Sequence, residues 1–284
     1  MGLRTGNNAL YLIYALLSDE AVKVRLRRTI KIGRTRPMAG HSKFKNIQHR
    51  KGAQDKKRAK VFTRLIKELA VAARAGTDPD ANPRLRTALA GCRAANMPKD
   101  NVERVLKRAE GGEGELYEEI RYEGYGTGGT AFIVEALTDN RNRTASEVRA
   151  AFNKFGGTLG ETGSVSFMFD KVGQMIFDAS AGDADTVFEA ALEAGADNVE
   201  SDEDVHVITT NPEDFNAVRE SLDAAFGAPQ EAQLTWIAQN SVDVDEGHAQ
   251  TLLKFMDTLD DNEDVQNIAF NFEISDEIMA KLEG

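Results

Sequence analysis

The spacing of apolar residues changes at Gly111 and Gly112, and this change restricts the possible folds more than any other feature of the 284-residue chain. Before the two glycines, apolar residues recur every three or four positions, as on one face of an α-helix. After them, short β-rich runs alternate with helical segments. We therefore expect an α+β protein with a helical N-terminal domain followed by mixed domains.

The helical part is expected to contain three helices joined by short connections. The first covers residues 53–75, and Gly76 ends it. The second begins at Asn82 and Pro83, a capping residue before a first-turn proline. It runs to about residue 95. The third carries Val102, Val105, Leu106 and Ala109 inward. We assign residues 38–112 to this domain.

Beyond the glycines, we expect a strand at residues 131–137, a helix after a capping box at residues 144–147, and a strand at 165–169. Residues 174–237 follow the order β-α-β-β-α-β of a split βαβ, ferredoxin-like unit. A helix at 246–259 and a strand at 265–272 would complete the first set. We interpret residues 113–170 and 240–284 as one discontinuous α+β domain, into which residues 171–239 insert a second.

Residues 1–37 do not resemble the rest of the chain. Met38 and the residues after it read as a natural start, so we interpret residues 1–37 as an extension that is either not native or weakly ordered. The alternative is an Arg-rich organelle transit peptide, against which Asp19, Glu20 and the shortage of serine count.

Charge is distributed very unevenly along the chain. Residues 38–110 hold 18 lysines and arginines against 7 acidic residues, whereas residues 111–284 hold 9 against 37. Such asymmetry indicates a polyanion-binding part joined to a part that repels polyanions. Solubility alone explains much of the acidic surface, but it does not explain why the basic residues gather at one end.

The strongest candidate site is the basic segment at residues 41–67, which contains one acidic residue, Asp55. Its cations, with four of them in a predicted helical stripe opposite the apolar face, are Lys43, Lys45, Arg50, Lys51, Lys56, Lys57, Arg58, Lys60, Arg64 and Lys67. Phosphate contacts by these side chains would give salt-dependent binding without separating DNA from RNA. Phe44 could stack on a base, although we favour its packing on the helical domain.

Two further motifs have competing interpretations. Arg141 and Arg143 precede the expected capped helix and could form a second phosphate contact with Arg149 and Lys154, or they could serve capping and salt bridges. Residues 124–129 match G-x-G-x-x-G, but a strand follows them instead of a helix. We therefore reject nucleotide binding and interpret the glycines as a tight connection.

Catalytic patterns are missing from the sequence. The four histidines lack metal-ligand spacing, and Cys92 is expected to be a small buried residue on a helix. We expect no enzyme activity, no cofactor and no metal. A single cysteine and the lack of an apolar stretch of spanning length favour a soluble cytoplasmic protein that does not contact membranes.

Several long motifs resemble the YebC family in the same order along the chain. They are MAGHSKFKNIQHRK at 38–51, NPRLR at 82–86, NMPKDN at 96–101, YEGYG at 122–126, EALTDNRNRT at 135–144 and the glycine pair at 156–157. The resemblance covers residues 38–284. It implies one helical and two α+β domains, and a regulator of transcription; mitochondrial relatives are translational activators, and some bacterial members resemble ribosome-associated factors.

Two positions depart from the family pattern. Phe44 stands where the family usually has tryptophan, which keeps an aromatic ring, and Thr127 stands where it usually has proline. We expect a DNA-binding transcriptional regulator that uses the basic helical domain, with acidic domains available to protein partners. The alternative is a ribosome-associated translation factor that binds rRNA or tRNA with the same surface. No small-molecule substrate is expected.

Overall fold

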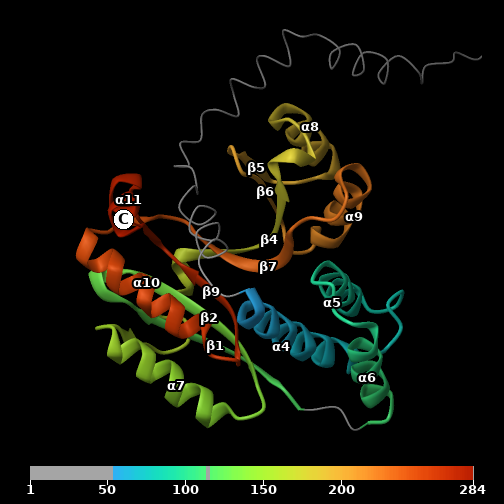
Figure 1. The fold of residues 1–284 in the computed structure, drawn as a ribbon, viewed down its shortest axis with the longest axis horizontal. Coiled ribbons are helices and arrows are strands. Elements are labelled where there is room, and N and C mark those ends of the chain that lie inside the picture. Colours follow the sequence, from blue (N-terminus) through green and yellow to red (C-terminus); the bar gives the residue numbers. More distant parts are fainter. Residues whose placement is uncertain (1–53, 113–115, 284) are drawn as a thin grey trace, which may run out of the picture. The chain divides into compact units, whose positions relative to one another are not determined.

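The computed structural model describes residues 54–112 and 116–283 (Figure 1). Its described part combines helices with antiparallel sheets, which confirms the α+β class with a helical N-terminal part. Residues 1–53 lie outside the described residues, so the expected extension at 1–37 stays a prediction. The domain boundaries drawn from the sequence also stay predictions.

The N-terminal helices are α4 (Gln54–Ala73), α5 (Pro83–Ala94) and α6 (Lys99–Glu110). The expected cap of α5 is present, because Asn82 Oδ1 accepts a hydrogen bond from the Leu85 amide at 3.0 Å. Leu69, Leu85 and Cys92 are fully or almost fully buried in the core that the three helices share. We call residues 54–112 the helical module.

The first sheet has the order β3-β1-β2-β9 and is antiparallel throughout. Its strands are β1 (Glu118–Tyr125), β2 (Ala131–Thr138), β3 (Thr158–Leu159) and β9 (Val265–Phe270). Helices α7 (Arg141–Lys154) and α10 (Glu246–Asp260) pack against it (Figure 1). Phe132, Phe152 and Phe255 meet edge to face in the core between sheet and helices.

The second sheet has the order β5-β6-β4-β7. Its strands are β4 (Phe169–Asp178), β5 (Asn198–Ser201), β6 (Val205–Thr210) and β7 (Glu231–Ala238). With α8 (Ala184–Ala194) and α9 (Phe215–Phe226), they run in the predicted order β-α-β-β-α-β. Met175, Ile208 and Leu222 lie in the core beneath the two helices.

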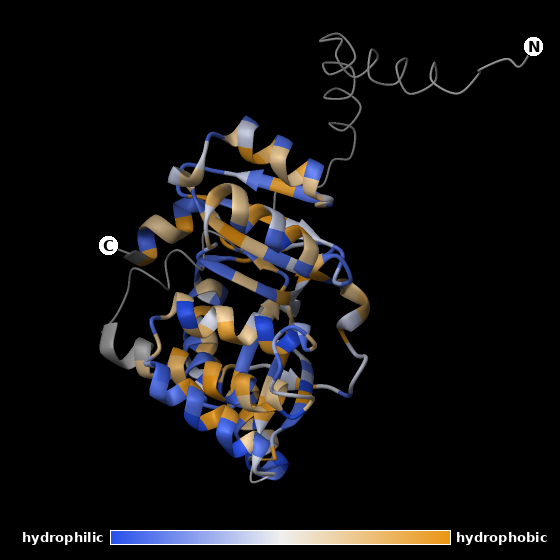
Figure 2. Cartoon of the chain, turned by 90° about the vertical axis from the view of Figure 1, so that its right-hand side faces the viewer, coloured by the Kyte–Doolittle hydropathy of each residue, from blue (hydrophilic) through white to orange (hydrophobic). Residues whose placement is uncertain are grey.

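Short elements complete the described chain. They are the 3₁₀ turns η1 (Thr127–Gly129), η2 (Ser166–Met168) and η3 (Ala179–Ala181), the two-stranded parallel pair β8 (Val242–Asp243) and β10 (Phe272–Glu273), and α11 (Asp276–Glu283). Hydrophobic and hydrophilic residues alternate along the helices in Figure 2, as amphipathic packing requires. In residues 54–112 and 116–283, no helix combines the length and apolar character that a membrane span needs.

Two expectations about local structure were wrong. Residues 165–169 do not form a strand of the first sheet; Ser166–Met168 is a 3₁₀ turn and β4 begins at Phe169. Buried Glu123 determines this local structure, because its carboxylate accepts hydrogen bonds from the amides of Val165 and Ser166 at 2.9 Å each. Strand β1 was not anticipated, because its first residues alternate too weakly in polarity.

The capping box expected at residues 144–147 is also wrong. The N-cap of helix α7 is Asn140, four residues before Thr144, and the helix itself begins at Arg141. The Asn140 side chain accepts the hydrogen bond of the Arg143 amide at 3.1 Å. Thr144 therefore lies inside the first turn, and its buried hydroxyl is free to bond elsewhere.

Candidate nucleic-acid interface

Three cations of the predicted α4 stripe are engaged with carboxylates of the same chain. Lys60 Nζ lies 2.8 Å from Asp260 and 3.1 Å from Asp261, and Arg64 Nη2 lies 2.9 Å from Asp260. Lys67 Nζ lies 2.7 Å from Asp264. The expectation of a free stripe held apart from the acid-rich remainder is therefore wrong for these three residues.

The physical reason lies in the end of α10. The helix ends at Asp260, and the four residues after it return to β9 through a turn. Together with Asp260 they comprise four acidic residues and one asparagine. We call residues 260–264 the acidic loop. Cations at spacings of three and four on α4 face this loop, so each gains a carboxylate partner at short range. Sequence spacing predicted the stripe of cations on α4 but not the carboxylates that pair with it.

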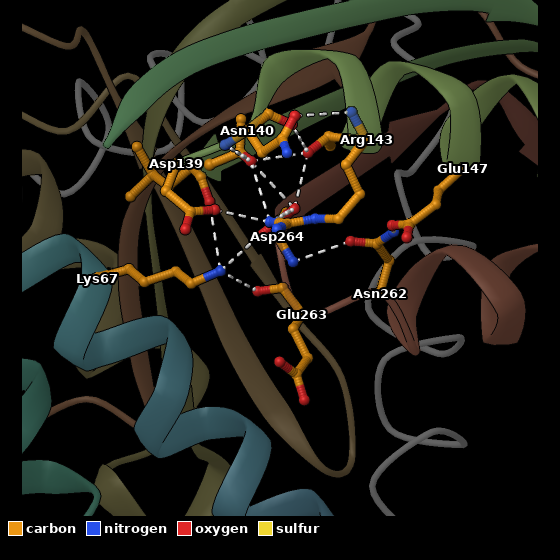
Figure 3. A network of polar contacts seen from close by, with 11 residues as sticks. Lys67, Asp139, Asn140, Arg143, Glu147, Asn262, Glu263 and Asp264 are labelled. Carbon is orange, nitrogen blue, oxygen red and sulfur yellow. Dashed lines mark hydrogen bonds and ion pairs between the residues drawn. The ribbon is translucent and has the colours of Figure 1, made fainter. Parts of the chain in front are cut away.

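Asp264 is the centre of a buried polar network (Figure 3). Its side chain is 4% exposed, and it accepts hydrogen bonds from Lys67 Nζ at 2.7 Å, Thr144 Oγ1 at 2.7 Å and Arg143 Nη2 at 2.8 Å. Thr138 Oγ1 donates a further bond at 3.1 Å. The network joins α4, β2, α7 and the acidic loop through one carboxylate.

The ionisation of Asp264 follows from these partners. Burial alone would raise the pKa of its carboxyl group, but the hydrogen bonds from Lys67, Arg143 and Thr144 outweigh burial and lower the pKa to about 2. The pKa of Asp260 is also lowered, because Arg64 and Lys60 outweigh the effect of its burial. Both groups are therefore carboxylates at neutral pH.

Lys67 belongs to the same network rather than to an accessible surface. The residue is 8% exposed, and its ammonium group also donates to the carbonyl oxygens of Glu263 at 2.9 Å and Leu137 at 3.4 Å. Tyr117 places its ring 5.6 Å from the same nitrogen. All of the ammonium group's hydrogens have partners, so Lys67 cannot bind a phosphate in this arrangement.

Most of the remaining predicted site residues lie outside the described residues. Nothing is described for Lys43, Phe44, Lys45, Arg50 and Lys51. Lys56, Lys57 and Arg58 belong to α4, but their side chains are likewise not described. Their part in a phosphate-binding surface stays a prediction.

Arg141 and Arg143, the second predicted phosphate contact, have different surroundings in the structure. Arg143 bonds to Asp139 at 2.8 Å and to Asp264 at 2.8 Å, so the salt-bridge alternative describes it. Arg141 is exposed in the first turn of α7, and no carboxylate partner is found for it among residues 54–112 and 116–283. Arg149 and Lys154 are exposed on the same helix.

The helical module presents further cations that the sequence interpretation did not single out. Arg93 on α5 and Arg104 and Lys107 on α6 are exposed, and none of the described carboxylates pairs with them. Arg104 bonds only weakly to Asn101, at 3.4 Å. The spacing of three between Arg104 and Lys107 is visible in the sequence. The longer basic run at residues 41–67 gave the stronger prediction of a phosphate-binding site.

A cavity of about 710 Å³ borders the Asp264 network. It is lined by side chains of both signs from α4, α7, α10 and the acidic loop, among them Lys67, Arg143, Glu147 and Glu263. Asn262 Nδ2 donates to Glu147 at 2.7 Å across one side of it. These pairings tie the elements together.

Cys92 and His206, whose side chains could in principle be reactive or bind a metal, have structural roles. Cys92 is 1% exposed, and burial raises the pKa of its thiol to about 11, which agrees with a buried packing residue. His206 is buried between Ser201 Oγ at 2.7 Å and the Gly182 carbonyl at 2.9 Å. Within residues 54–112 and 116–283, no group of three metal-ligating side chains is found.

The glycine-rich segment at residues 124–129 joins strand β1 to strand β2. The Gly126 amide donates to the Thr130 carbonyl at 2.8 Å, closing a tight connection around η1. A Cβ on Gly124 would lie 2.6 Å from the Thr158 carbonyl oxygen, so close strand packing requires this glycine. The segment leads from one strand into the next and opens no α-helix.

The fold and the network define a class of protein. A basic three-helix module is followed by two antiparallel sheets with helices packed on them, and along the sequence the strands of the second sheet lie between β3 and β9 of the first. Comparison with known proteins identifies the class. Residues 42–112 match the TACO1/YebC protein N-terminal domain, and residues 117–272 match the TACO1/YebC second and third domain.

The chain belongs to the TACO1/YebC family, which confirms the resemblance drawn from its motifs. This is a family of transcription regulators or translational activators. A solved structure of a conserved hypothetical protein from Aquifex aeolicus is similar, with 44% sequence identity and a TM-score of 0.74. The match covers 78% of this chain and 93% of the other.

Proposed function

We propose that this protein is a nucleic-acid-binding regulator of gene expression that binds DNA as a transcriptional regulator. Its N-terminal basic segment contacts phosphate, and its acidic domains are available to protein partners. It acts in the cytoplasm, away from membranes, without catalytic chemistry, a cofactor or a small-molecule substrate. Membership of the TACO1/YebC family supports the regulatory role.

The observation that carries the proposal is the charge of residues 41–58. This segment holds seven lysines and arginines against a single acidic residue, Asp55. The next three cations along the chain, at positions 60, 64 and 67, have carboxylate partners. A surplus of cations of this size before the paired positions favours a polyanion as the partner of the segment.

Exposed cations outside the segment support a broader contact. Arg93, Arg104 and Lys107 extend positive charge over α5 and α6, and Arg141 adds an exposed guanidinium at the start of α7. Contacts of this kind position a phosphate backbone without reading sequence. The proposal therefore assigns salt-dependent binding to the protein and assigns no sequence preference.

A ribosome-associated translation factor is the second candidate, because the family also includes translational activators. The same basic segment would then contact rRNA or tRNA. Phosphate contacts have the same chemistry on either polymer, so the two candidates differ in where the protein is found in the cell. Sedimentation of lysate through a sucrose gradient, with and without DNase, and crosslinking to chromosomal DNA distinguish them.

The test removes charge from the segment without touching the paired cations. In a Lys43→Gln, Lys45→Gln, Lys51→Gln variant, we expect affinity for duplex DNA and for single-stranded RNA to fall by roughly tenfold or more at low salt. The slope of log affinity against log salt should fall by about 2 to 3, since three phosphate contacts are lost. Fluorescence anisotropy titrations over a range of salt concentrations measure both quantities.

A matched control separates the segment from overall charge. Lys171, Lys254 and Lys281 are exposed residues of the acidic part, and changing all three to glutamine removes the same charge. We expect this control to bind within about twofold of the wild type. Equal losses in both triple variants would contradict the assignment to the segment, and no binding by the wild type would exclude the proposed function.

A further inference from the structure

The helical module has its own hydrophobic core, separate from the rest of the chain. Every described member of that core lies between Phe62 and Ala109. The other hydrophobic clusters of the described chain contain no residue from the module. Hydrophobic packing therefore stabilises the module internally and contributes little to its attachment.

Polar contacts make the attachment instead. Lys60, Arg64 and Lys67 pair with the acidic loop, and two further arginines of α5 pair with the α+β part. Those pairs are Arg84 with Glu119, and Arg86 with Glu220 at 3.2 Å, beside a hydrogen bond from Thr87 to Asn216 at 3.1 Å. A joint built from ion pairs can open at a smaller cost than one built from buried apolar surface.

The pairing of Arg64 is incomplete in the attached state. Its Nη2 bonds to the carboxylate of Asp260 at 2.9 Å and to the carbonyl oxygen of the same residue at 3.1 Å. Its Nε is buried and has no hydrogen-bond partner. A guanidinium satisfies carboxylate or phosphate best through two parallel N–H bonds, and Asp260 supplies only one. The acidic loop is therefore an imperfect partner for this arginine.

We propose that the acidic loop is an intramolecular competitor of nucleic acid: Asp260 and Asp261 occupy phosphate-binding cations of α4, and a nucleic acid that takes Lys60 and Arg64 releases this part of the helical module from Asp260 and Asp261. The proposal rests on the proposed function and adds its regulation. Carboxylates on a short loop stand in for successive phosphates, so each state satisfies the same cations. Lys67 stays with Asp264 as the deeper part of the joint.

Competition has a direct consequence for affinity. When only a fraction of molecules has Lys60 and Arg64 available, the apparent dissociation constant rises in proportion. Weakening the acidic loop should therefore tighten binding, even though it changes no residue that contacts nucleic acid. A loop that is only structural would show the opposite or no effect, because its loss would leave α4 less ordered.

The experiment uses the full chain with Asp260→Asn and Asp261→Asn, which keep the shape of both side chains and leave Asp264 in place. We expect affinity for a labelled duplex DNA and for a single-stranded RNA to rise about fivefold to tenfold over the wild type. Anisotropy titrations measure this rise. Circular dichroism and thermal unfolding check that the variant is folded.

A second readout follows the module itself. In a Cys92→Ala background, Ala94→Cys on α5 and Lys254→Cys on α10 provide two exposed labelling sites for energy transfer. We expect transfer to fall in the Asp260→Asn, Asp261→Asn variant without ligand, and to fall in the otherwise unaltered labelled chain when DNA or RNA is added.

The matched control is Asp197→Asn with Asp243→Asn, two exposed acids that pair with no cation in the described part of the chain. It makes the same change in net charge, so any general electrostatic gain in affinity appears there as well. The proposal requires the loop variant to bind at least about threefold more tightly than this control.

The outcomes separate the two proposals. Wild-type binding with no gain in the loop variant over the control overturns the competition and leaves the proposed function standing. A gain in affinity with unchanged energy transfer also overturns it, because the module was not released. If neither the wild type nor the loop variant binds DNA or RNA, the proposed function fails and the competition fails with it.

Discussion

At the scale of single residues, Asp264 does the most to define this molecule. One buried carboxylate accepts hydrogen bonds from Lys67, Arg143, Thr144 and Thr138, which belong to three elements besides its own loop. Removing one partner from such a cluster is costly, since the others remain buried without compensation. The motif at residues 138–144 therefore has a structural role, because its side chains bind the Asp264 carboxylate.

We predict that Asp264→Asn lowers the free energy of unfolding by about 2 to 4 kcal/mol at pH 7. The amide cannot neutralise Lys67 and Arg143, and its NH₂ group would face either the Lys67 ammonium group or the three donors at the other oxygen. Urea unfolding followed by circular dichroism measures the change. The exposed Asp243→Asn substitution should cost less than about 0.5 kcal/mol. Equal stability of Asp264→Asn and wild type would contradict the role of the network.

The same carboxylate predicts a pH dependence. Its pKa is about 2 in the folded protein, below the ordinary value of 3.8, so folding favours the ionised form. Its stabilising contribution is fully present above about pH 4 and is lost as the pH falls through about 2. The stability difference between wild type and Asp264→Asn should therefore shrink over that interval. A difference that stays constant down to pH 2 would show that charge is not its source.

At the scale of elements, one side chain links α4 to α5. Asn82 caps α5 through its Oδ1 atom, and its Nδ2 donates to the carbonyls of Ala72 and Gly76 at 2.8 Å each. The Ala72 carbonyl lies in the last turn of α4, where the i to i+4 hydrogen bonds of a helix run out, and the Gly76 carbonyl lies three residues beyond the end of the helix. The connection between the two helices is thus satisfied by a residue that both accepts and donates.

Asn82→Asp separates these two tasks. Aspartate is as good an N-cap as asparagine, but it cannot donate to the two carbonyls and places negative charge beside them. We predict a loss of about 2 kcal/mol in the free energy of unfolding, measured by urea denaturation. The reverse change Asp183→Asn, at the N-cap of α8, should cost less than about 1 kcal/mol, because Asp183 only accepts. Similar losses at both caps would contradict the donor role of Asn82.

At the scale of the whole described chain, two joints of different chemistry hold the parts together. Residues of both sheets share one apolar cluster, in which Ile133 and Ala269 pack with Phe169 and Trp236. The Trp236 indole donates to Glu135 at 2.9 Å. The helical module is attached by ion pairs instead. Salt screens charge pairs and leaves apolar burial almost unchanged, so the two joints should respond differently to ionic strength.

We predict that raising salt from about 0.1 M to about 1 M, which shortens the Debye length from roughly 10 Å to 3 Å, loosens the helical module selectively. Hydrogen exchange measured by mass spectrometry should speed up in α4 to α6. The fluorescence of Trp236, the single tryptophan of the chain, should keep its unfolding midpoint or shift it upward. Parallel changes in both regions would contradict an attachment built mainly from ion pairs.

The sequence alone determined the element types and their order. Periodicity predicted three helices before Gly111, and alternating patterns predicted the split βαβ unit, because both depend on which residues must turn toward a core. Sequence patterns did not predict segments that are only weakly amphipathic, or segments whose conformation depends on contacts with distant residues. Strand β1 depends on its partner strands, and the 3₁₀ turn at residues 166–168 depends on Glu123, which lies about forty positions earlier.

Tertiary structure determines which groups pair with the cations of α4. Spacing placed Lys60, Arg64 and Lys67 on one face of a helix, and it assigned them to a phosphate surface. Only the folded chain brings residues 260–264, nearly two hundred positions away, against that face. Charge pairing acts through space and ignores sequence separation, so a count of cations shows where positive charge gathers but not which partner neutralises it.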